Sequence, residues 1–522
     1  MTPFRTAALA VCVAALATTF CQDARAQAPQ RGGRAAIWLN ADIRSLEPGI
    51  NRDANTDGIV HQIYEGLVGY QTDLGVGPAL ADSWTSSEDG RVWTFKLRDN
   101  AVFHNGARLT SADVKAAWDR QWNNQAWPCR RIFDQSGGLQ VQSVEAPDAS
   151  TIVYRIANPS ALFLPWMASV QCGVVVAHQD SFGADGKFQA PIGTGPWKLG
   201  EWRRGELVTL QRFEQYGASS APASGYSGRR DVMLDQVIYR VIPDQSAAEA
   251  ALQTGAIDLM PDADIERADA LRAQGLRVQS APGLSWSTLL IQTNDPVLKD
   301  PRIRRAMAHA IDLSQLAEIR TMGLAEPSPS PVSPSMSFFD ESFRAWPAYD
   351  PARARALLRE AGYRNQVIKL QTNRRYNGMY DNSVATQAML TAAGFRVELE
   401  VLDWATQLSN YTTGNFQLQS FSFSPRLDTG LAFSSLVGEK ARGASAQWEN
   451  PEVIRLLTES SATSDMTRRA ELFRQMHALM AQDVPSIGLY FMPQIVASRQ
   501  DLQGVTPWPA GRPVTWGIWR QR

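Results

Sequence analysis

Residues 80–114 read LADSWTSSEDGRVWTFKLRDNAVFHNGARLTSADV and pass from strand to helix patterning. The Asp-Gly dipeptide at 89–90 lies between two apolar runs, which predicts a hairpin turn. Beyond the turn, residues 93–98 alternate apolar and polar side chains, the period of a strand with one buried face. The Thr-Ser pair at 110–111 then supplies the cap of a helix whose apolar residues recur every fourth position. The stretch therefore predicts mixed α and β structure.

The same mixture continues along the 522 residues. Residues 33–40 and 367–372 have strand character, whereas 245–254 is helical and is followed by a glycine that can end the helix. Asp-Pro pairs at 300–301 and 350–351 each predict a helix start, with the acid as cap and proline in the first turn. At roughly 150 residues per domain, the length predicts two to four domains. We expect an α/β fold (mixed α+β) with two lobes and a cleft between them.

Composition excludes several classes of protein. Lys and Arg number 51 against 52 Asp and Glu, so no strong basic field attracts nucleic acid or an anionic membrane. The four Cys and five scattered His do not have metal-ligand spacing, and we expect neither a metal nor another cofactor. The sixteen Trp suit core packing or the lining of a ligand cleft.

Residues 1–26 have the pattern of a cleavable signal peptide. Arg5 provides the positive start, residues 7–20 form a short apolar run, and Ala-Arg-Ala at 24–26 is a cleavage pattern. An N-terminal membrane anchor is the alternative. We therefore expect a periplasmic protein, and an oxidising compartment allows Cys129 and Cys172 to form a disulfide. Two buried thiols are the alternative at these positions.

Local enzyme motifs are missing. Residues 225–229 (GYSGR) fail as a nucleophile elbow because the last position is Arg, and His61 is followed by Gln, not by the Glu of a zinc-protease motif. No catalytic residue is assigned, and we expect a protein that is not an enzyme. A hydrolase with two carboxylates remains an alternative because such a pair needs no local signature.

A series of short motifs follows one another in fixed order and together resembles the bacterial extracellular solute-binding proteins of family 5. This family contains the oligopeptide and dipeptide receptors of ABC importers. The resemblance covers nearly all of residues 33–520, and its turn glycines, caps and core aromatics indicate scaffold roles. The motifs are YEGL at 64–67, LADSW at 80–84, WTFKLR at 93–98, FHNG at 103–106, LTSADV at 109–114, PIGTGPW at 191–197, DPRIRRA with AID at 300–312, and YDPARA with AGY at 349–363.

The resemblance implies a two-lobed periplasmic-binding-protein fold of the group with an extra subdomain inserted in the first lobe. The lobes close over the ligand by a hinge motion. Partners would be a small peptide-like ligand and an inner-membrane ABC permease, with no nucleic acid, and the receptor would be a monomer. The implied boundaries are 27–74 with 190–281 and 480–522 for the first lobe, 75–189 for the subdomain, and 282–479 for the second lobe.

Ligand-facing residues also follow from the resemblance. Dipeptide receptors of the family have an Arg-x-Tyr-Asn segment whose Arg holds the peptide carboxylate, and residues 374–377 (RRYN) match it. This implies roles for Arg374, Tyr376 and Asn377, since a guanidinium can bind a carboxylate with two hydrogen bonds. A solvated surface Arg is the alternative. Trp404 matches a family aromatic near the pocket, with core packing as its alternative.

Residues 420–429 (SFSFSPRLDT) depart from the family pattern. Peptide receptors tend to have Trp here and, three residues later, an Asp that pairs with the peptide ammonium. Phe423 and Arg426 take these positions, which reverses the charge, and Asp428 replaces the acid only if the loop shifts.

An Arg426 that faces the cleft would repel a free ammonium. We therefore expect a ligand with acid groups at both ends, such as an opine, an acidic or N-blocked peptide, or an acyl or phosphorylated derivative. In the alternative, Arg426 faces solvent or pairs with Asp428. Arg52 and Asn55 match a ligand-facing loop of the first lobe.

Other functions remain open. The same fold could carry an oligosaccharide, an opine, nickel or haem, although none of the five His lies in the expected pocket segments. A periplasmic enzyme or chaperone is a further alternative. The leading prediction is an extracytoplasmic receptor that delivers a peptide-like solute to an ABC permease.

Overall fold

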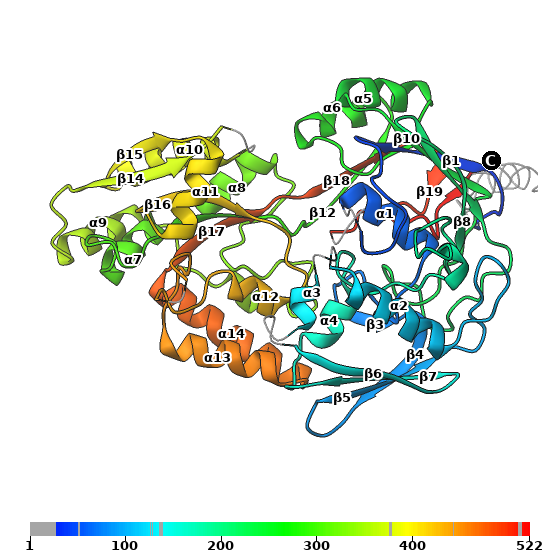
Figure 1. Ribbon diagram of the computed structural model, residues 1–522. Coiled ribbons are helices and arrows are strands. Elements are labelled where there is room, and N and C mark those ends of the chain that lie inside the picture. The colour runs from blue at the N-terminus through cyan, green and yellow to red at the C-terminus, as the bar shows by residue number, and fades with distance from the viewer. Residues whose placement is uncertain are drawn as a thin grey trace, which may run out of the picture.

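The protein is described here from a computed structural model that covers residues 28–50, 53–125, 127, 129–134, 139–374, 378–441, 443–509 and 514–521. Two lobes, each built on its own sheet, lie side by side, and a third, smaller sheet extends from the first lobe (Figure 1). The expected mixed α/β, two-lobed fold is confirmed. The predicted signal peptide, 1–26, lies outside the described residues.

The first lobe is built on a seven-stranded sheet. Its central strand β1 is buried on both faces, as expected for a strand between two parallel neighbours. Alternate β1 side chains enter different cores: Ile37 packs in the core shared with the inserted subdomain, and Trp38 packs with α5. In spatial order the strands are β12 (Arg277–Ala281), β18 (Gln494–Ser498), β11 (Leu259–Met260), β1 (Arg34–Leu39), β10 (Gln236–Val241), β9 (Leu207–Arg212) and β8 (Trp197–Arg203).

Helices and two short sheets complete this lobe. The predicted helix at 245–254 is α5, and Gly255 ends it in the left-handed conformation. The remaining elements are α1 (Ala54–Ile63), α6 (Ala268–Ala273), the pair β2 (Val68–Tyr70) with β3 (Val76–Pro78), and the pair β19 (Leu502–Gln503) with β20 (Trp519–Arg520).

The inserted subdomain holds the hairpin and helix expected from residues 80–114. Thr110 and Asp113 form a reciprocal capping box at the start of α2, and Trp118 of that helix packs edge-on against Tyr154 of the sheet. The sheet order is β4 (Ala81–Ser86), β5 (Val92–Leu97), β7 (Thr151–Ile156) and β6 (Val141–Asp148), with helices α2 (Ser111–Asn123), α3 (Arg130–Phe133) and α4 (Phe163–Ala168).

The second lobe is built on a five-stranded sheet in which three neighbouring strands are parallel. The Asp-Pro helix starts are confirmed, because Asp300 and Asp350 each accept a backbone hydrogen bond at a helix N-terminus. The sheet order is β15 (Arg396–Val401), β14 (Val367–Thr372), β16 (Leu418–Phe423), β13 (Trp286–Ile291) and β17 (Ser486–Phe491). The helices are α7 (Pro301–Ala310), α8 (Leu313–Thr321), α9 (Pro351–Glu360), α10 (Met379–Ala392), α11 (Trp404–Thr413), α12 (Thr429–Ser434), α13 (Pro451–Ala462) and α14 (Met466–Asp483).

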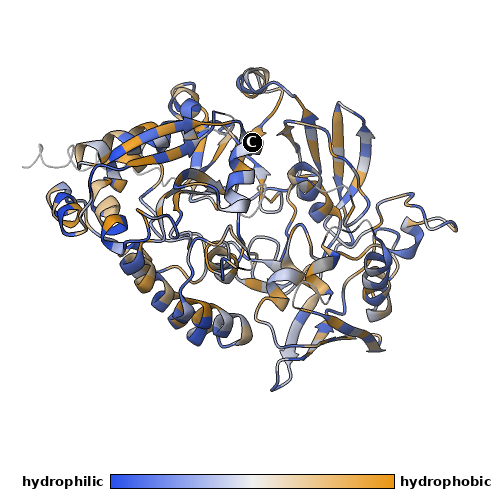
Figure 2. Ribbon diagram, turned by 60° about the vertical axis from the view of Figure 1, so that its left-hand side comes forward, coloured by the Kyte–Doolittle hydropathy of each residue, from blue (hydrophilic) through white to orange (hydrophobic). Residues whose placement is uncertain are grey.

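Apolar residues follow this arrangement. Figure 2 shows orange residues concentrated on the strands, while the outer helices alternate orange with blue. One core packs under α7, α9 and α10 against one face of the second-lobe sheet, and a separate small core packs under α5 and α6 of the first lobe. The largest core is shared, because it runs from the first lobe and the inserted subdomain to the other face of the second-lobe sheet and to α12, α13 and α14.

Two neighbouring segments carry the chain between the lobes. β12 leads into β13, and β17 leads into β18. Residues 282–285 and 492–493 therefore form a hinge made of two segments of the same chain (Figure 1). Within it, the Met492 amide donates to the Ser285 carbonyl at 2.9 Å. A Cβ on Gly283 would lie 2.0 Å from the Met492 carbonyl oxygen, so only glycine permits this approach.

The predicted return to the first lobe at residue 480 is too early. β17 pairs with β13 in the second-lobe sheet, and the chain crosses back only at residues 492–493. The boundary was placed too early because no short sequence pattern shows which of the two sheets a strand joins.

Candidate functional site

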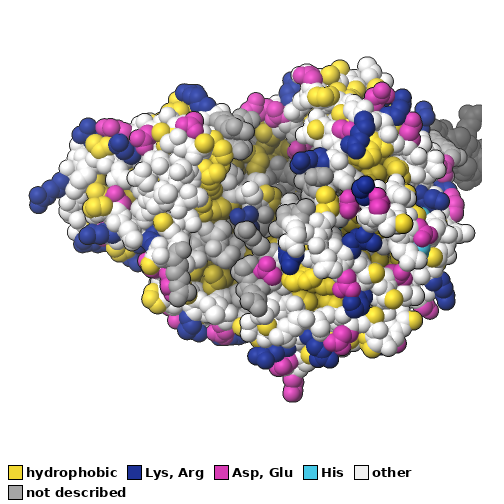
Figure 3. All heavy atoms as spheres, viewed as in Figure 1, with side chains coloured by type: hydrophobic (Ala, Val, Ile, Leu, Met, Phe, Trp, Pro, Cys, Tyr) yellow, Lys and Arg dark blue, Asp and Glu magenta, His cyan; other side chains and the backbone are white. Residues whose placement is uncertain are grey.

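A cavity of about 400 Å³ lies between the lobes, beside the hinge. Figure 3 shows the hollow between the two halves, with hydrophobic side chains on its walls. The lining comes from segments far apart in the chain, which only the tertiary fold brings together. They are Ala54, Asp57, Gly58, Val170, Gln171, Tyr226, Pro261, Asp262, Gln494 and Pro509 from the first lobe, Gly283, Leu284, Ser285, Met492 and Pro493 at the hinge, and Pro425 and Leu427 from the second lobe.

The start of α1 forms part of the first-lobe wall. Asp53 caps the helix by accepting from the Thr56 amide, which fixes the direction in which Asp57 and Gly58 meet the cavity. Asn55, predicted to face the ligand, is buried, and its amide nitrogen donates to Asn40 Oδ1 at 2.9 Å and to the Ala41 carbonyl at 2.8 Å. In this structure Asn55 ties the end of β1 to α1. Arg52 lies outside the described residues.

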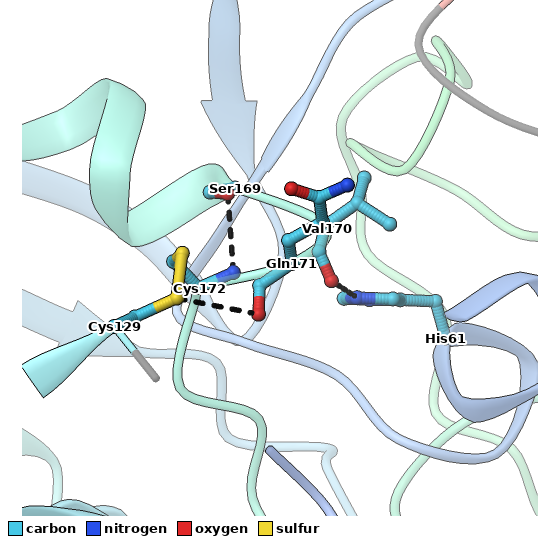
Figure 4. The surroundings of a disulfide bond; sticks show 6 residues. All are labelled: His61, Cys129, Ser169, Val170, Gln171 and Cys172. Atoms are coloured by element: carbon cyan, nitrogen blue, oxygen red, sulfur yellow. Dashed lines mark hydrogen bonds between the residues drawn. A yellow bond between two sulfur atoms is a disulfide. The ribbon is translucent and has the colours of Figure 1, made fainter. Parts of the chain in front are cut away.

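A disulfide holds a second part of the same wall (Figure 4). Cys129 and Cys172 are bonded, with their Cα atoms 5.4 Å apart. The neighbouring Val170 and Gln171 line the cavity, and the Val170 carbonyl lies 2.8 Å from His61 Nε2 on α1. The structure therefore links the disulfide to the cavity through two adjacent residues.

The second-lobe side is formed at the carboxyl ends of parallel strands, where ligands commonly bind to α/β sheets. Arg374 follows β14, Trp404 follows β15, and Phe423 ends β16. The Arg374 side chain is exposed and its guanidinium lies 3.6 Å from the centre of the Tyr380 ring. Tyr376 and Asn377 lie outside the described residues. The topology thus brings three predicted residues to one edge of the sheet, although none of them lines the cavity itself.

The aromatic residues at this edge pack on one another. Trp404 is half-buried, with its ring 5.8 Å from that of Phe421, which in turn lies 5.1 Å from Phe423. Phe423 is only 5% exposed and also stacks on Trp286 of β13. Phe423 therefore supports the wall from behind, and Trp404 is the more accessible of the two predicted aromatics.

The loop after β16 separates the two charged candidates. Pro425 and Leu427 line the cavity on either side of Arg426, whose side chain is half-buried and donates to the Ser424 carbonyl at 3.1 Å. Asp428 instead caps α12 and pairs with Arg469 of α14 at 3.2 Å, with 8% of its surface exposed. The Asp428 carboxylate is thus committed to the scaffold, and its partner is Arg469 rather than Arg426.

Sequence reasoning identified none of the residues that line this cavity. The residues that it did not identify include Asp57, Gln171, Tyr226, Asp262 and the hinge positions. Only Gly283 carried a usable signal, as a glycine in the Ala-Pro-Gly-Leu sequence between two strands.

Among the described residues, no group of three or more His, Cys, Asp or Glu could hold a metal ion. No helix in the described part of the chain is long and apolar enough to cross a membrane.

Comparison with known proteins identifies the family. The model of "Bacterial extracellular solute-binding proteins, family 5 Middle" matches residues 75–445, more than half of the chain. The chain belongs to family 5 of the bacterial extracellular solute-binding proteins. It is 25% identical to the glutathione-binding protein GsiB of Escherichia coli K12, over 90% of this chain and 91% of that protein.

Solved structures agree on the fold. HbpA2 from Haemophilus parasuis has a TM-score of 0.83 and 22% identity, covering 94% of this chain and 100% of that one. The periplasmic binding protein DppA from Helicobacter pylori, in complex with the peptide STSA, has a TM-score of 0.67 and 24% identity, covering 94% of this chain and 99% of that one.

The family 5 motifs serve the scaffold, as predicted. Glu65 of the YEGL motif is fully buried and pairs with Arg98 of the WTFKLR motif at 2.8 Å. Burial alone would raise the pKa of Glu65, but Arg98 and Arg230 lower it below its usual value, so this carboxyl stays ionised. Tyr216 donates to the same carboxylate at 2.9 Å. This charged cluster joins segments of the first lobe and of the inserted subdomain, and Arg230 connects it to the cavity wall by donating to the Tyr226 carbonyl at 2.8 Å.

Proposed function

We propose that this family 5 protein is the substrate-binding receptor of a bacterial ABC importer, which captures a peptide-like solute between its lobes and delivers it to the permease. The observation that carries the proposal is the cavity of about 400 Å³ whose lining comes from both lobes and from the hinge. A ligand that contacts both walls binds the closed form better than the open form, so its binding energy favours closure. The protein acts without chemical turnover, as a periplasmic monomer released from its signal peptide.

The charges around the cavity define the ligand more closely. On the second-lobe side, Arg426 lies between two lining residues and the nearby acid Asp428 is already paired with Arg469, so an acid group of the solute is favoured there. On the first-lobe side, Asp57 and Asp262 line the cavity, which disfavours a second acid group close to them. We therefore propose an acidic peptide or opine-like solute with an acid group at Arg426. The name of the relative GsiB is consistent with this, because glutathione is an acidic tripeptide.

The first experiment compares the mass of the natively purified mature protein with its mass after denaturation. Co-purified solute appears as excess mass that disappears on denaturation, and an anionic peptide or opine supports the proposal. Without excess mass, glutathione, acidic dipeptides and opines are tested by thermal shift. A ligand that is chemically converted during incubation, or the failure of every peptide and opine, would count against it.

Arg426→Asp tests the charge of the ligand. We expect the variant to lose affinity for an anionic solute by a factor of ten or more, at about 1.4 kcal/mol for each factor of ten, and to gain affinity for peptides with a free ammonium. Arg359→Asp is the matched control, since Arg359 is an exposed residue of α9 that does not line the cavity. An Arg426→Asp variant with unchanged ligand preference would exclude Arg426 from the site.

A further inference from the structure

A second cavity, of about 290 Å³, lies at the junction of the first lobe and the inserted subdomain. None of its lining residues lines the interlobe cavity. Its volume is at the small end of ligand sites, which usually enclose about 300–1,000 Å³. The loop before α1, one side of α2 and the segment 175–182 form its walls.

The floor of this cavity is apolar. Its charged lining residues are Arg120, Glu47 and Asp113, and the Asp113 carboxylate already accepts from the Thr110 amide and hydroxyl at the start of α2. Ala112, Ala116 and Arg120 follow one another every fourth residue along α2, and Val175 and Phe182 lie opposite. The guanidinium of Arg120 lies 3.6 Å from the centre of the Phe182 ring. Among the described residues, Arg120 has no acid within 4.0 Å of its nitrogens.

Glu47 provides the opposite charge on the facing loop. Its backbone amide donates to Ser45 Oγ at 2.9 Å, and Tyr64 donates to the preceding carbonyl of Leu46 at 3.0 Å, so the loop is anchored. Burial raises the pKa of Glu47, while Arg120 acts to lower it. The two charged groups thus interact across the cavity without forming an ion pair.

Gln121 supplies the third observation. Its side chain lines the cavity and is only 5% exposed, yet neither its amide oxygen nor its amide nitrogen has a hydrogen-bond partner within the described part of the chain. The amide fits beside Gly49, where a Cβ would lie 2.2 Å from Gln121 Nε2. A buried amide without partners costs about 1–3 kcal/mol, and native proteins keep few such groups unless something else satisfies them.

We infer that this cavity binds a small α-amino acid, with the carboxylate at Arg120, the ammonium at Glu47, a hydrogen bond to the Gln121 amide, and a short apolar side chain on the alanine floor. A zwitterion matches two opposite charges that line one cavity without forming an ion pair. The cavity volume limits the side chain to a few carbon atoms. This site is separate from the interlobe cleft, so it stands or fails independently of the importer ligand.

Calorimetric titration of the mature protein with L-alanine and L-valine tests the inference. We expect both to bind, and N-acetyl-L-alanine and L-alanine methyl ester, which each lack one charge, to bind at least about tenfold more weakly. Arg120→Gln and Glu47→Gln should each weaken L-alanine binding by a similar factor. Arg204→Gln is the matched control, because Arg204 also stacks at 3.6 Å on an aromatic ring, that of Trp202, but lines neither cavity.

Gln121→Met separates a ligand-binding role from a structural one. The substitution removes an unpaired buried amide, so we expect the free protein to unfold at a higher temperature while L-alanine binding weakens. A lower unfolding temperature would show that the amide has a structural partner and would overturn the inference. No binding of either amino acid, binding that persists in Arg120→Gln and Glu47→Gln, or binding lost in Arg204→Gln would also overturn it.

Discussion

Replacing both Cys129 and Cys172 by Ser tests the link between the disulfide and the cleft wall. The two residues are 43 apart in sequence, and closing a loop of this length lowers the entropy of the unfolded chain. The chain-entropy relation gives a stabilisation of about 4 kcal/mol at 25 °C. We therefore expect the double variant to lose about 4 kcal/mol of unfolding free energy in the folding unit that contains the inserted subdomain.

Urea unfolding of the oxidised protein, the reduced protein and the double variant measures this loss. The reduced protein is the internal control, because it lacks the bond but keeps both sulfur atoms, and it should match the double variant. Ligand affinity should fall in both, since Val170 and Gln171 lie next to Cys172 and line the cavity. Free thiols in the oxidised protein, or a loss below about 1 kcal/mol, would refute the reasoning.

Further changes test the core, the response to pH and the hinge. Glu65→Gln leaves Arg98 buried without a counter-charge and should lower the free energy of unfolding in urea by about 3–5 kcal/mol. The double variant Glu65→Gln/Arg98→Met should recover part of this free energy. A double variant that is as unstable as Glu65→Gln, or less stable, would contradict the pairing. Burial lowers the pKa of His104 and of His477 to about 4. Because the unfolded chain binds these protons near pH 6.5, stability should be full above that pH and fall towards pH 4, by roughly 2 kcal/mol per histidine at pH 5; unchanged unfolding free energy between pH 7 and 5 would disprove it. Gly283→Ala should displace the hinge, cost about 1–3 kcal/mol and weaken ligand binding, whereas unaltered affinity would show that the hinge tolerates a side chain.

Local patterns predicted the secondary structure well. The strand at 367–372 and the helix at 245–254 have the expected bounds, because alternation, a capping acid and a terminal glycine act over a few residues. The motif order predicted the two-lobed fold, since each motif reports a turn, a cap or a buried contact of that fold. The early return predicted at residue 480 shows the limit, because strand partners are chosen by tertiary contacts.

The candidate site was harder to predict from the sequence than the fold was. Arg374, Trp404 and Phe423 were predicted individually, and the parallel strands bring them to one edge of the sheet. The commitment of Asp428 to Arg469 could not be predicted, because 41 residues separate the partners. The partner of Asn55 was also missed, although Asn40, which accepts a hydrogen bond from the Asn55 amide, lies only 15 residues away.

By itself, the sequence determined the elements, their caps, the family and the class of function, because these depend on short-range patterns and on motifs in a fixed order. Tertiary structure alone decided which residues line the interlobe cavity and which carboxylates are already paired. It also placed Glu47 and Arg120 around one hollow. The physical reason is that burial and charge pairing depend on distances in space, and the chain brings together residues that lie hundreds of positions apart.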